Sequence, residues 1–353
     1  MEDKGQNDTQ DAGNSSTITF RKPIEIPVNS ETLPCLPVAG NSKRAEIEHW
    51  EDSVARFRVP VKRLWMVPAL VLLFSVALAA KRPAPGTLYV VVKPVANMYR
   101  DASTNTDVVS QAIYGNNVTL VEFKKHWVKI KTADSYAGWM QIGDLRKLAG
   151  QAYAAQGAAV RVAELSANVY REPDVTAHAP VVTIPWESRL EVISEKVADG
   201  DRWLKVRLAD GSEGYVQRGD VSSDFAPLSI EQMIGVARRF LGVTYTWGGT
   251  SSSGFDCSGF TQMLERQRGV VMPRDADLQA EWSGVSEVQR TDLLAGDLLF
   301  FGKDAKHITH TGMYIGNGEF IHDSTHEHPM VQISKLDDKP WTEILVAARR
   351  IKP

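Results

Sequence analysis

The sequence predicts a C-terminal α+β domain, preceded by two small β-barrels and, before them, by one membrane-spanning segment. Three observations lead to this prediction. Helical periodicity followed by short apolar runs occupies the C-terminal third, an internal repeat occupies the middle, and an uncharged apolar run precedes the repeat. The 353 residues suffice for two or three domains, and a formal net charge of −3 gives no reason to expect a nucleic acid partner.

The N-terminal region predicts a tail and then an anchor. Residues 1–55 are polar, low in aromatic residues and without a sustained period, which is typical of disorder. The run from Leu64 to Ala80 is uncharged and apolar, and its length of about 17 residues is near the lower limit for spanning a bilayer. Four basic residues precede it: Arg56, Arg58, Lys62 and Arg63. Because only Lys81 and Arg82 follow, the N-terminus is expected on the cytoplasmic side.

This anchor predicts a single-pass protein of the cell membrane, with the C-terminal domain outside the cytoplasm. Ala77-Leu78-Ala79 resembles a cleavage site, so secretion after removal of a signal peptide is the alternative. Both interpretations place the chain after Lys81 outside the cytoplasm. A buried core helix fits less well, because no polar face interrupts the run.

Residues 87–150 and 157–225 form the two copies of the repeat. Asn97-Met98-Tyr99-Arg100 matches Asn168-Val169-Tyr170-Arg171, and Trp127 to Ile130 matches Trp203 to Val206. Short alternating runs split by turn residues predict small antiparallel strands. The copies resemble bacterial SH3-like domains, which bind cell-wall material or only pack against a catalytic domain. We expect the tryptophans to lie in the barrel cores.

After Pro227 the pattern becomes helical and then strand-like. Ser229 with Gln232 three residues later predicts a capping box, and apolar residues follow at helical spacing as far as Leu241. The runs "GDLLFF", "HTGMYIG", "EFIHD" and "EILVAARRI" predict strands.

Cys257 is placed where a helix is expected to begin. The chain has two cysteines, too few for a disulfide framework, and Cys35 lies in the polar tail. The glycine-rich "WGGTSSSGFD" leads up to Cys257, and Asp256 is a candidate N-cap. Unpaired N–H groups in a first helical turn favour a thiolate and can donate to an oxyanion.

Two histidines are expected on neighbouring strands. His310 opens one apolar run and His322 lies near the end of the next, after Gly316-Asn317-Gly318. A turn centred on Gly316-Asn317 would place the histidines nearly opposite, whereas Asn317-Gly318 would offset them by about three residues. A cysteine, a histidine and a second polar residue that orients the histidine are the parts of a thiol protease.

The remaining histidines of this region predict no metal site. His307, His326 and His328 are expected in loops near the site, since there is no HExxH spacing and no cysteine pair. The sequence predicts no cofactor.

Three blocks in order, "FDCSGF", "GDLLFF" and "HTGMYIGNGEFIH", resemble the NlpC/P60 cell-wall cysteine peptidases, which have a papain-like fold. The resemblance covers the region 228–353. It implies that Cys257 is the nucleophile, His310 the base and His322 the residue that orients His310. A catalytically inactive wall-binding protein and a papain-like acyltransferase are the alternatives.

The combination of two SH3-like domains with this peptidase domain resembles the γ-D-glutamyl-L-diamino acid endopeptidases. These cut peptidoglycan stem peptides, and their first SH3-like domain narrows the cleft so that a free N-terminal L-alanine is needed. The resemblance implies four substrate-binding residues: Tyr136, Asp256, Ser258 and Asp275. The alternative for Tyr136 is a residue of the barrel alone. The sequence departs at Ala276, where serine is common, and at Asn116, where an acid is expected. The expected partners are stem peptides and the cell membrane; neither the preferred diamino acid nor the oligomeric state follows from the sequence.

Overall fold

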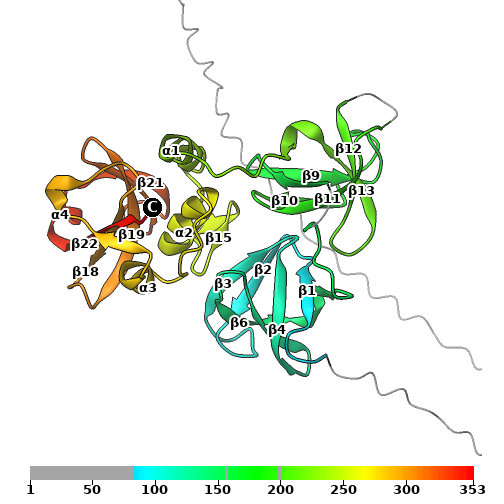
Figure 1. The fold of residues 1–353 in the computed structure, drawn as a ribbon, viewed down its shortest axis with the longest axis horizontal. Helices are drawn as coiled ribbons and strands as arrows, with labels where there is room; N and C mark the ends of the chain where they lie inside the picture. Colours follow the sequence, from blue (N-terminus) through cyan, green and yellow to red (C-terminus); the bar gives the residue numbers. More distant parts are fainter. Residues whose placement is uncertain (1–82, 156–157, 198–200) are drawn as a thin grey trace, which may run out of the picture. The chain divides into compact units, whose positions relative to one another are not determined.

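A computed structural model describes residues 83–155, 158–197 and 201–353 (Figure 1). The predicted tail, Cys35 and the apolar run Leu64 to Ala80 lie outside the described residues. Within the described ranges, no helix is both long and apolar enough to cross a membrane.

The first copy of the repeat forms a seven-stranded antiparallel sheet, which we call the first module. The sheet order is β3-β2-β6-β5-β4-β1-β7. Its strands are β1 (Leu88–Val91), β2 (Val95–Tyr99), β3 (Val108–Ile113), β4 (Asn117–Lys124), β5 (Trp127–Lys131), β6 (Ala137–Gln141) and β7 (Leu145–Lys147), with a 3-10 turn at Ile142–Asp144. Alternating buried side chains such as Val128 and Ile130 fill its core, as the period-two pattern predicts.

The second copy repeats this arrangement strand for strand, and we call it the second module. Its order is β10-β9-β13-β12-β11-β8-β14. Its strands are β8 (Ala159–Val162), β9 (Ser166–Tyr170), β10 (Val182–Pro185), β11 (Arg189–Ser194), β12 (Trp203–Arg207), β13 (Glu213–Gln217) and β14 (Val221–Ser222), with a 3-10 turn at Arg218–Asp220. The aromatic pair of the repeat is also preserved. Tyr99 meets Trp127 edge-on at 5.5 Å between ring centroids, and Tyr170 meets Trp203 at 5.6 Å.

The third part of the chain places three of its four helices before a sheet, as the α+β prediction expected. Its helices are α1 (Ile230–Arg239), α2 (Cys257–Gln267), α3 (Ala276–Glu281) and α4 (Trp341–Ile344), and β15 (Thr250–Ser251) pairs with β16 (Gly254–Phe255). The antiparallel sheet has the order β17-β22-β18-β19-β20-β21. Its strands are β17 (Val285–Glu287), β18 (Leu298–Gly302), β19 (Ile308–Gly316), β20 (Glu319–Ser324), β21 (Met330–Lys335) and β22 (Leu345–Ile351), and a 3-10 turn lies at Arg290–Asp292.

Helix α1 begins with the predicted capping box. The Ser229 hydroxyl accepts from the Gln232 N–H at 3.2 Å, and the Gln232 side chain accepts from the Ser229 N–H at 2.9 Å. The helix ends at Arg239, so Leu241 lies beyond it and is exposed. The four predicted strands are confirmed as β18, β19, β20 and β22, although β22 begins only at Leu345 because α4 occupies the preceding residues.

Helix α2 packs on the sheet through an apolar core. Phe260 and Met263 of α2 belong to one buried apolar cluster with Phe300, Met313 and Ile321 of the sheet. A second cluster gathers around Trp341 of α4, with Phe301 and Phe320. These two clusters fix the start of α2 and the middle of β19 and β20, where the candidate catalytic residues lie.

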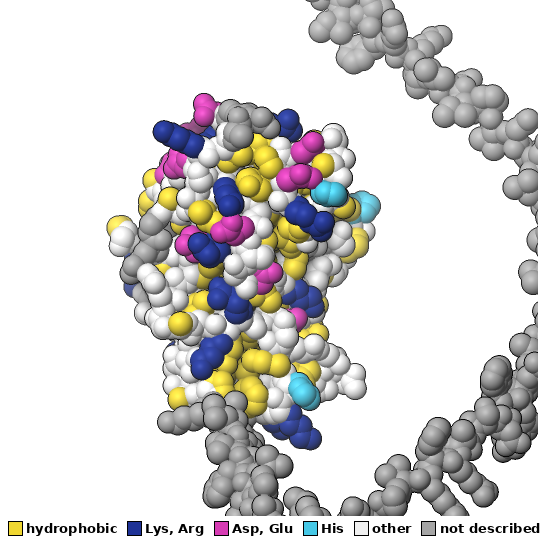
Figure 2. Space-filling model, turned by 90° about the vertical axis from the view of Figure 1, so that its right-hand side faces the viewer, with side chains coloured by type: hydrophobic (Ala, Val, Ile, Leu, Met, Phe, Trp, Pro, Cys, Tyr) yellow, Lys and Arg dark blue, Asp and Glu magenta, His cyan; other side chains and the backbone are white. Residues whose placement is uncertain are grey.

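Charge on the molecular surface is mixed. Figure 2 shows basic, acidic and hydrophobic side chains interspersed on the face in view, with no single-sign patch gathered there. This distribution agrees with the small net charge of the sequence.

Candidate active site

Helix α2 begins at Cys257, and Asp256 is its N-cap, as predicted. The Asp256 carboxylate accepts from the Gly259 N–H at 2.7 Å. Cys257 therefore lies in the first helical turn, with a nearly buried side chain. The sequence suggested a thiolate favoured by the helix N-terminus. Instead, burial and then the charge of Asp256 raise the pKa of the Cys257 thiol to about 12. The N–H groups of Thr311 and Ser258 lower this pKa, but by less than burial and Asp256 raise it. The free protein therefore holds a neutral thiol that must lose its proton during the reaction.

A buried arginine that the sequence analysis missed joins two of the predicted binding residues. Arg274 donates to both carboxylate oxygens of Asp256, at 3.0 and 2.6 Å, and to the Ser258 hydroxyl at 2.8 Å. Asp256 also accepts from the Gly248 N–H at 3.0 Å. Charge pairing and bidentate geometry hold this group rigidly beside the nucleophile. Its only signal in the sequence was a position next to Asp275.

The histidine strands are joined by a turn centred on Asn317-Gly318, the second of the two predicted registers. Both residues have positive φ, 55° and 75°, as the mirror-image hairpin turn requires. Gly316 pairs with Glu319 but Tyr314 pairs with Phe320, so Ile315 is an extra, bulged residue. The bulge reduces the predicted offset of three residues to two. Because strand side chains alternate, an offset of three would put the histidines on different faces, and the bulge returns them to one face.

His310 and His322 are in direct contact. The distance between His310 Nε2 and His322 Nδ1 is 2.8 Å. The Cβ atom that a larger residue would have at Gly312 would lie 2.9 Å from the His322 Cβ, so the strand has space for His322 only because position 312 is glycine. His322 is completely buried, and its Nε2 lies 3.0 Å from the Ser334 hydroxyl.

Aromatic rings surround this pair and keep it neutral. Trp341 stacks near His310 with centroids 5.3 Å apart and meets His322 edge-on at 4.8 Å, and Phe301 and Phe320 complete the enclosure. Burial, and then the nearby His326, lower the pKa of His310 to about 3. Burial also lowers the pKa of His322 well below its usual range. Both imidazoles are therefore uncharged at neutral pH.

Strand β19 passes directly beside the nucleophile. The N–H of Thr311, the residue after His310, lies close enough to the Cys257 thiol to lower its pKa. The cleft at Cys257 is also lined by Ile308 and Thr309 of this strand. The fold therefore brings the helix start and the histidine strand, which are far apart in the sequence, to one place.

The other three histidines lie in loops, as predicted. His307 pairs with Asp304 between β18 and β19, and His326 and His328 lie between β20 and β21. Across the described ranges, no group of three histidine, cysteine or acidic residues is arranged to hold a metal ion.

The first module contributes one wall of the cleft. The cleft has a volume of about 540 Å³, and Tyr136 of this module lines it together with Cys257, Asp275 and Ala276. The Tyr136 hydroxyl donates to the Asp275 carboxylate at 3.3 Å. Burial, and then the charge of Asp275, raise the pKa of Tyr136 to about 12, so the phenol keeps its proton. Two predicted binding residues from distant parts of the chain are thus brought together.

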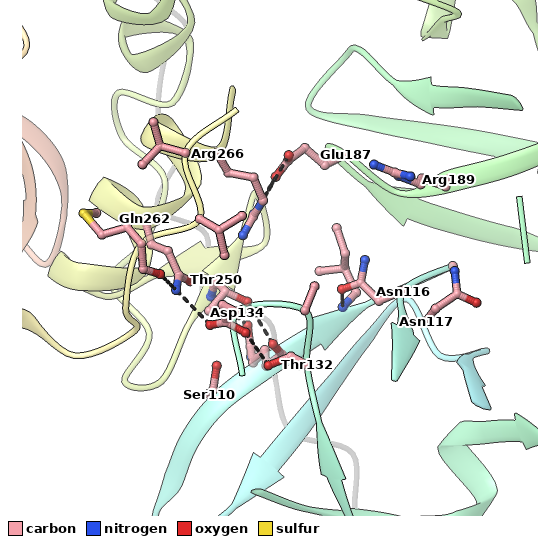
Figure 3. A pocket seen from close by; sticks show the side chains of 17 residues that line it. Ser110, Asn116, Asn117, Thr132, Asp134, Glu187, Arg189, Thr250, Gln262 and Arg266 are labelled. Atoms are coloured by element: carbon pink, nitrogen blue, oxygen red, sulfur yellow. Dashed lines mark hydrogen bonds and ion pairs between the residues drawn. The ribbon is translucent and has the colours of Figure 1, made fainter. Parts of the chain in front are cut away.

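A second cavity of about 280 Å³ is lined by residues of α2 and of both modules (Figure 3). There Gln262 of α2 donates to Asp134 of the first module at 2.9 Å, and Arg266 forms an ion pair with Glu187 of the second module at 2.6 Å. Asn116 lines this cavity, where its side chain accepts from the Ile113 N–H. Asn116, where an acid was expected, therefore lines this second cavity.

A cysteine at a helix start, a cleft beside it and a histidine pair on the adjoining strands define a cysteine peptidase. Comparison with known proteins agrees. The NlpC/P60 family model matches residues 242–350, and the model of the bacterial dipeptidyl-peptidase SH3 domain matches residues 98–145. The chain is 32% identical over 143 residues to the probable endopeptidase NlpC homolog of Haemophilus influenzae, covering 40% of this chain and 74% of that protein. This chain belongs to the NlpC/P60 family of cysteine peptidases.

Longer matches include the modules. The γ-D-glutamyl-L-lysine dipeptidyl-peptidase of Bacillus cereus is 29% identical over 344 residues, covering 92% of this chain and 99% of that protein. A Bacillus subtilis protein of the same name is 29% identical over 271 residues, covering 70% of this chain and 82% of that protein. The crystal structure of an NlpC/P60 family protein from Bacillus cereus gives a TM-score of 0.65 at 26% identity, covering 76% of this chain and all of that one.

Proposed function

We propose that this enzyme hydrolyses the γ-D-glutamyl-diamino acid bond of peptidoglycan stem peptides and prefers stems with a free N-terminal L-alanine. The observation that carries the proposal is the hydrogen bond between Tyr136 and Asp275 at the wall of the cleft. A carboxylate held there by a neutral phenol is a partner for an ammonium group. The similar Bacillus proteins are named as γ-D-glutamyl-L-lysine dipeptidyl-peptidases, which supports the γ-D-glutamyl bond as the one that is cut.

In the proposed mechanism, Cys257, His310 and His322 act as in papain-like peptidases. As the Cys257 sulfur attacks the γ-carbonyl carbon, its proton passes to His310. Because His310 Nε2 is committed to His322, Nδ1 is the nitrogen that receives the proton. His310 then gives this proton to the leaving amine, and the C–N bond breaks to leave a thioester. Water attacks the thioester with His310 again as base, which releases the dipeptide carboxylate and restores the thiol.

The first test compares L-Ala-γ-D-Glu-L-Lys with its N-acetylated form. Acetylation removes the charge of the amine and adds bulk at a narrowed cleft. We expect kcat/KM to fall at least ten- to a hundredfold, the range for a lost hydrogen bond to a charged group. Mass spectrometry would identify Ala-Glu and lysine as products. Equal kcat/KM values for the two peptides would contradict the preference for a free amine.

The second test concerns the catalytic residues. Cys257→Ala should abolish hydrolysis with little change in thermal stability, and His310→Ala should lose about as much, because members of a catalytic unit are not additive. His322→Ala should be less damaging, since His322 orients rather than attacks. Undiminished hydrolysis by Cys257→Ala would refute the mechanism.

We also propose that the chain is anchored in the cell membrane with the enzyme outside the cytoplasm. The basic residues before Leu64 to Ala80 support this orientation. Reporters that work only outside or only inside the cytoplasm, fused after Pro227, would test it. A signal from the cytoplasmic reporter alone would contradict it, and sequencing the mature N-terminus would distinguish an anchor from a cleaved signal.

A further inference from the structure

A buried glutamine of α2 holds two chain segments that lead to the cleft. The Gln262 side chain is almost completely buried, and its amide nitrogen donates to the Asp134 carboxylate and to the Met272 carbonyl, each at 2.9 Å. Figure 3 shows the bond to Asp134 of the first module. A carboxylate and a carbonyl can only accept, so the amide nitrogen must face both of them, and both of its protons are used.

These two segments carry the residues that meet at the cleft wall. Asp134 lies two residues before Tyr136, and Met272 lies three residues before Asp275. The Tyr136 hydroxyl donates to the Asp275 carboxylate at 3.3 Å. One buried amide group therefore connects the segments that carry both partners of this contact.

The segment of the first module is a tight turn that ties Tyr136 to Asp134. The Thr132 N–H donates to the Tyr136 carbonyl at 3.0 Å, and the Ser135 N–H donates to the Thr132 carbonyl at 3.0 Å. Ser135 has a φ of 69°, a left-handed conformation that is uncommon for residues other than glycine. Because these bonds close the turn, a shift of Asp134 moves Tyr136 as well.

The segment that carries Asp275 has further attachments within the catalytic domain. The Gln279 side chain donates to the Pro273 carbonyl at 3.0 Å, and Arg274 is held by its bidentate bonds to Asp256. Asp275 therefore keeps its place when the hairpin of the first module moves. The hairpin is the part whose position depends on the buried glutamine.

We propose that Gln262 and Asp134 are positioning residues whose hydrogen bond keeps Tyr136 at the cleft wall. There Tyr136 holds the carboxylate of Asp275 for the ammonium group, so the bond supports the preference for a free N-terminal amine. This proposal rests on the proposed function. Neither Gln262 nor Asp134 is among the described residues that line the cleft at Cys257, so their effect passes through the hairpin.

The first experiment measures the place of Tyr136 without substrate. In the full-length chain labelled with ¹³C at the tyrosine Cζ, NMR gives the Tyr136 signal, which is assigned by its loss in Tyr136→Phe. Asp275→Ala shows the shift of this signal without the contact, and Asp134→Ala should move the signal toward that shift. Asp134 is only half-buried, so this variant should fold. An unchanged signal in Asp134→Ala would overturn the proposal, even if the proposed function were wrong.

The second experiment is kinetic. Asp134→Ala should lower kcat/KM for L-Ala-γ-D-Glu-L-Lys about three- to tenfold, the range for one hydrogen bond, and should change little for the N-acetylated peptide. The loss should appear in KM, because the amine contact lies away from the reacting bond. Asp134→Asn keeps an acceptor oxygen and should restore most of the rate. Equal losses with both peptides would overturn the proposal.

The equivalent hairpin of the second module provides the matched control. Asp210 occupies the position of Asp134, but its carboxylate accepts from its neighbour Ser212 in the same turn, from the N–H at 2.9 Å and the hydroxyl at 2.6 Å. Asp210→Ala should change neither the Tyr136 signal nor the rate with either peptide. An effect equal to that of Asp134→Ala would mean that loss of a turn contact alone is sufficient, and would overturn the proposal.

The two proposals fail in different ways. In a Tyr136→Phe background, Asp134→Ala should cause no further loss, since no hydroxyl remains to be positioned. A further loss as large as that in the wild-type background would overturn the role of Asp134 alone. Equal kcat/KM values of the wild-type enzyme for the free and the acetylated peptide would contradict the proposed preference, and the NMR shift would still decide whether the bond positions Tyr136.

Discussion

The equivalent turn in each module packs against a different part of the protein. The turn between β3 and β4 carries Tyr114, and the equivalent turn between β10 and β11 carries Trp186. Both have a residue of positive φ next, Gly115 at 79° and Glu187 at 66°. Tyr114 packs into the core of the second module, where its hydroxyl accepts from the Ala209 N–H at 2.8 Å. Trp186 packs into the core of the catalytic domain, 5.6 Å from Phe240. Each module thus inserts one aromatic side chain into the next part of the chain.

The hairpins between β5 and β6 and between β12 and β13 differ more. In the first module Asp134 binds Gln262 at the second cavity and Tyr136 binds Asp275 at the cleft, so this hairpin contacts the catalytic domain at two places. In the second module the equivalent Asp210 accepts from the N–H of its neighbour Ser212 at 2.9 Å and only closes its own turn. One repeat therefore supplies a wall of the cleft, while the other is a structural support.

The largest expected effect tests the supporting role of the second module. Trp186→Ala removes a buried side chain from the catalytic core and should lower the free energy of unfolding by about 3–5 kcal/mol. Trp186→Phe keeps an aromatic ring at this position and removes a buried indole N–H that has no partner, so it should cost less than Trp186→Ala. Urea unfolding would measure both. A loss below about 1 kcal/mol for Trp186→Ala would show that the second module does not stabilise the catalytic domain.

The next prediction assigns part of the pH dependence of stability to the catalytic domain. Asp323 of β20 is completely buried, and neither of its carboxyl oxygens accepts a well-formed hydrogen bond. Burial, followed by the charge of Asp256, raises its pKa to about 8, and the nearby N–H groups of Phe255 and Ser324 only partly offset this rise. Its folded pKa is thus above its unfolded value. The contribution of the protonated carboxyl to the free energy of unfolding is fully present below about pH 4. This contribution is lost as pH rises to about 8, and the loss is on the order of a few kcal/mol.

Asp323→Asn should remove this loss, so its unfolding free energy should vary less between pH 5 and pH 8 than that of the wild type. Chemical unfolding at several pH values would show the difference. If the unfolding free energies of the variant and the wild type changed equally with pH, Asp323 would be ionised in the folded protein over this range. If Trp186→Ala uncouples the second module, the Asp323-dependent slope should remain with the transition of the catalytic domain.

The sequence predicted the parts of the site that depend on local pattern. The start of α2 at Cys257 and the cap at Asp256 followed from polar and apolar spacing, and the histidine strands followed from apolar runs around a glycine-rich turn. Family motifs then supplied the roles. The internal repeat also held in the fold, because matching residues such as Trp127 and Trp203 occupy matching strands.

Features that depend on tertiary contact were not predictable. The bulge at Ile315 adds one residue to a register, and no composition signal marks it. Arg274 binds an aspartate far upstream, and Ser334 reaches His322 only because β21 pairs with β20. The predicted thiolate at Cys257 was wrong because helix-start chemistry is local, whereas the burial that outweighs it comes from the whole domain.

The smallest effect tests whether the two hairpins differ in function. Tyr136→Phe removes only the hydroxyl that donates to Asp275, so kcat/KM for the free-amine peptide should fall about tenfold, while the acetylated peptide should change little. Ser212→Ala, at the equivalent position of the second module, contacts only its own turn and should alter neither rate. Because Tyr136 is half-buried and keeps its ring as phenylalanine, folding should be nearly unaffected. Equal losses with both peptides would assign Tyr136 to general cleft shape, and an equal loss in Ser212→Ala would remove the distinction between the modules.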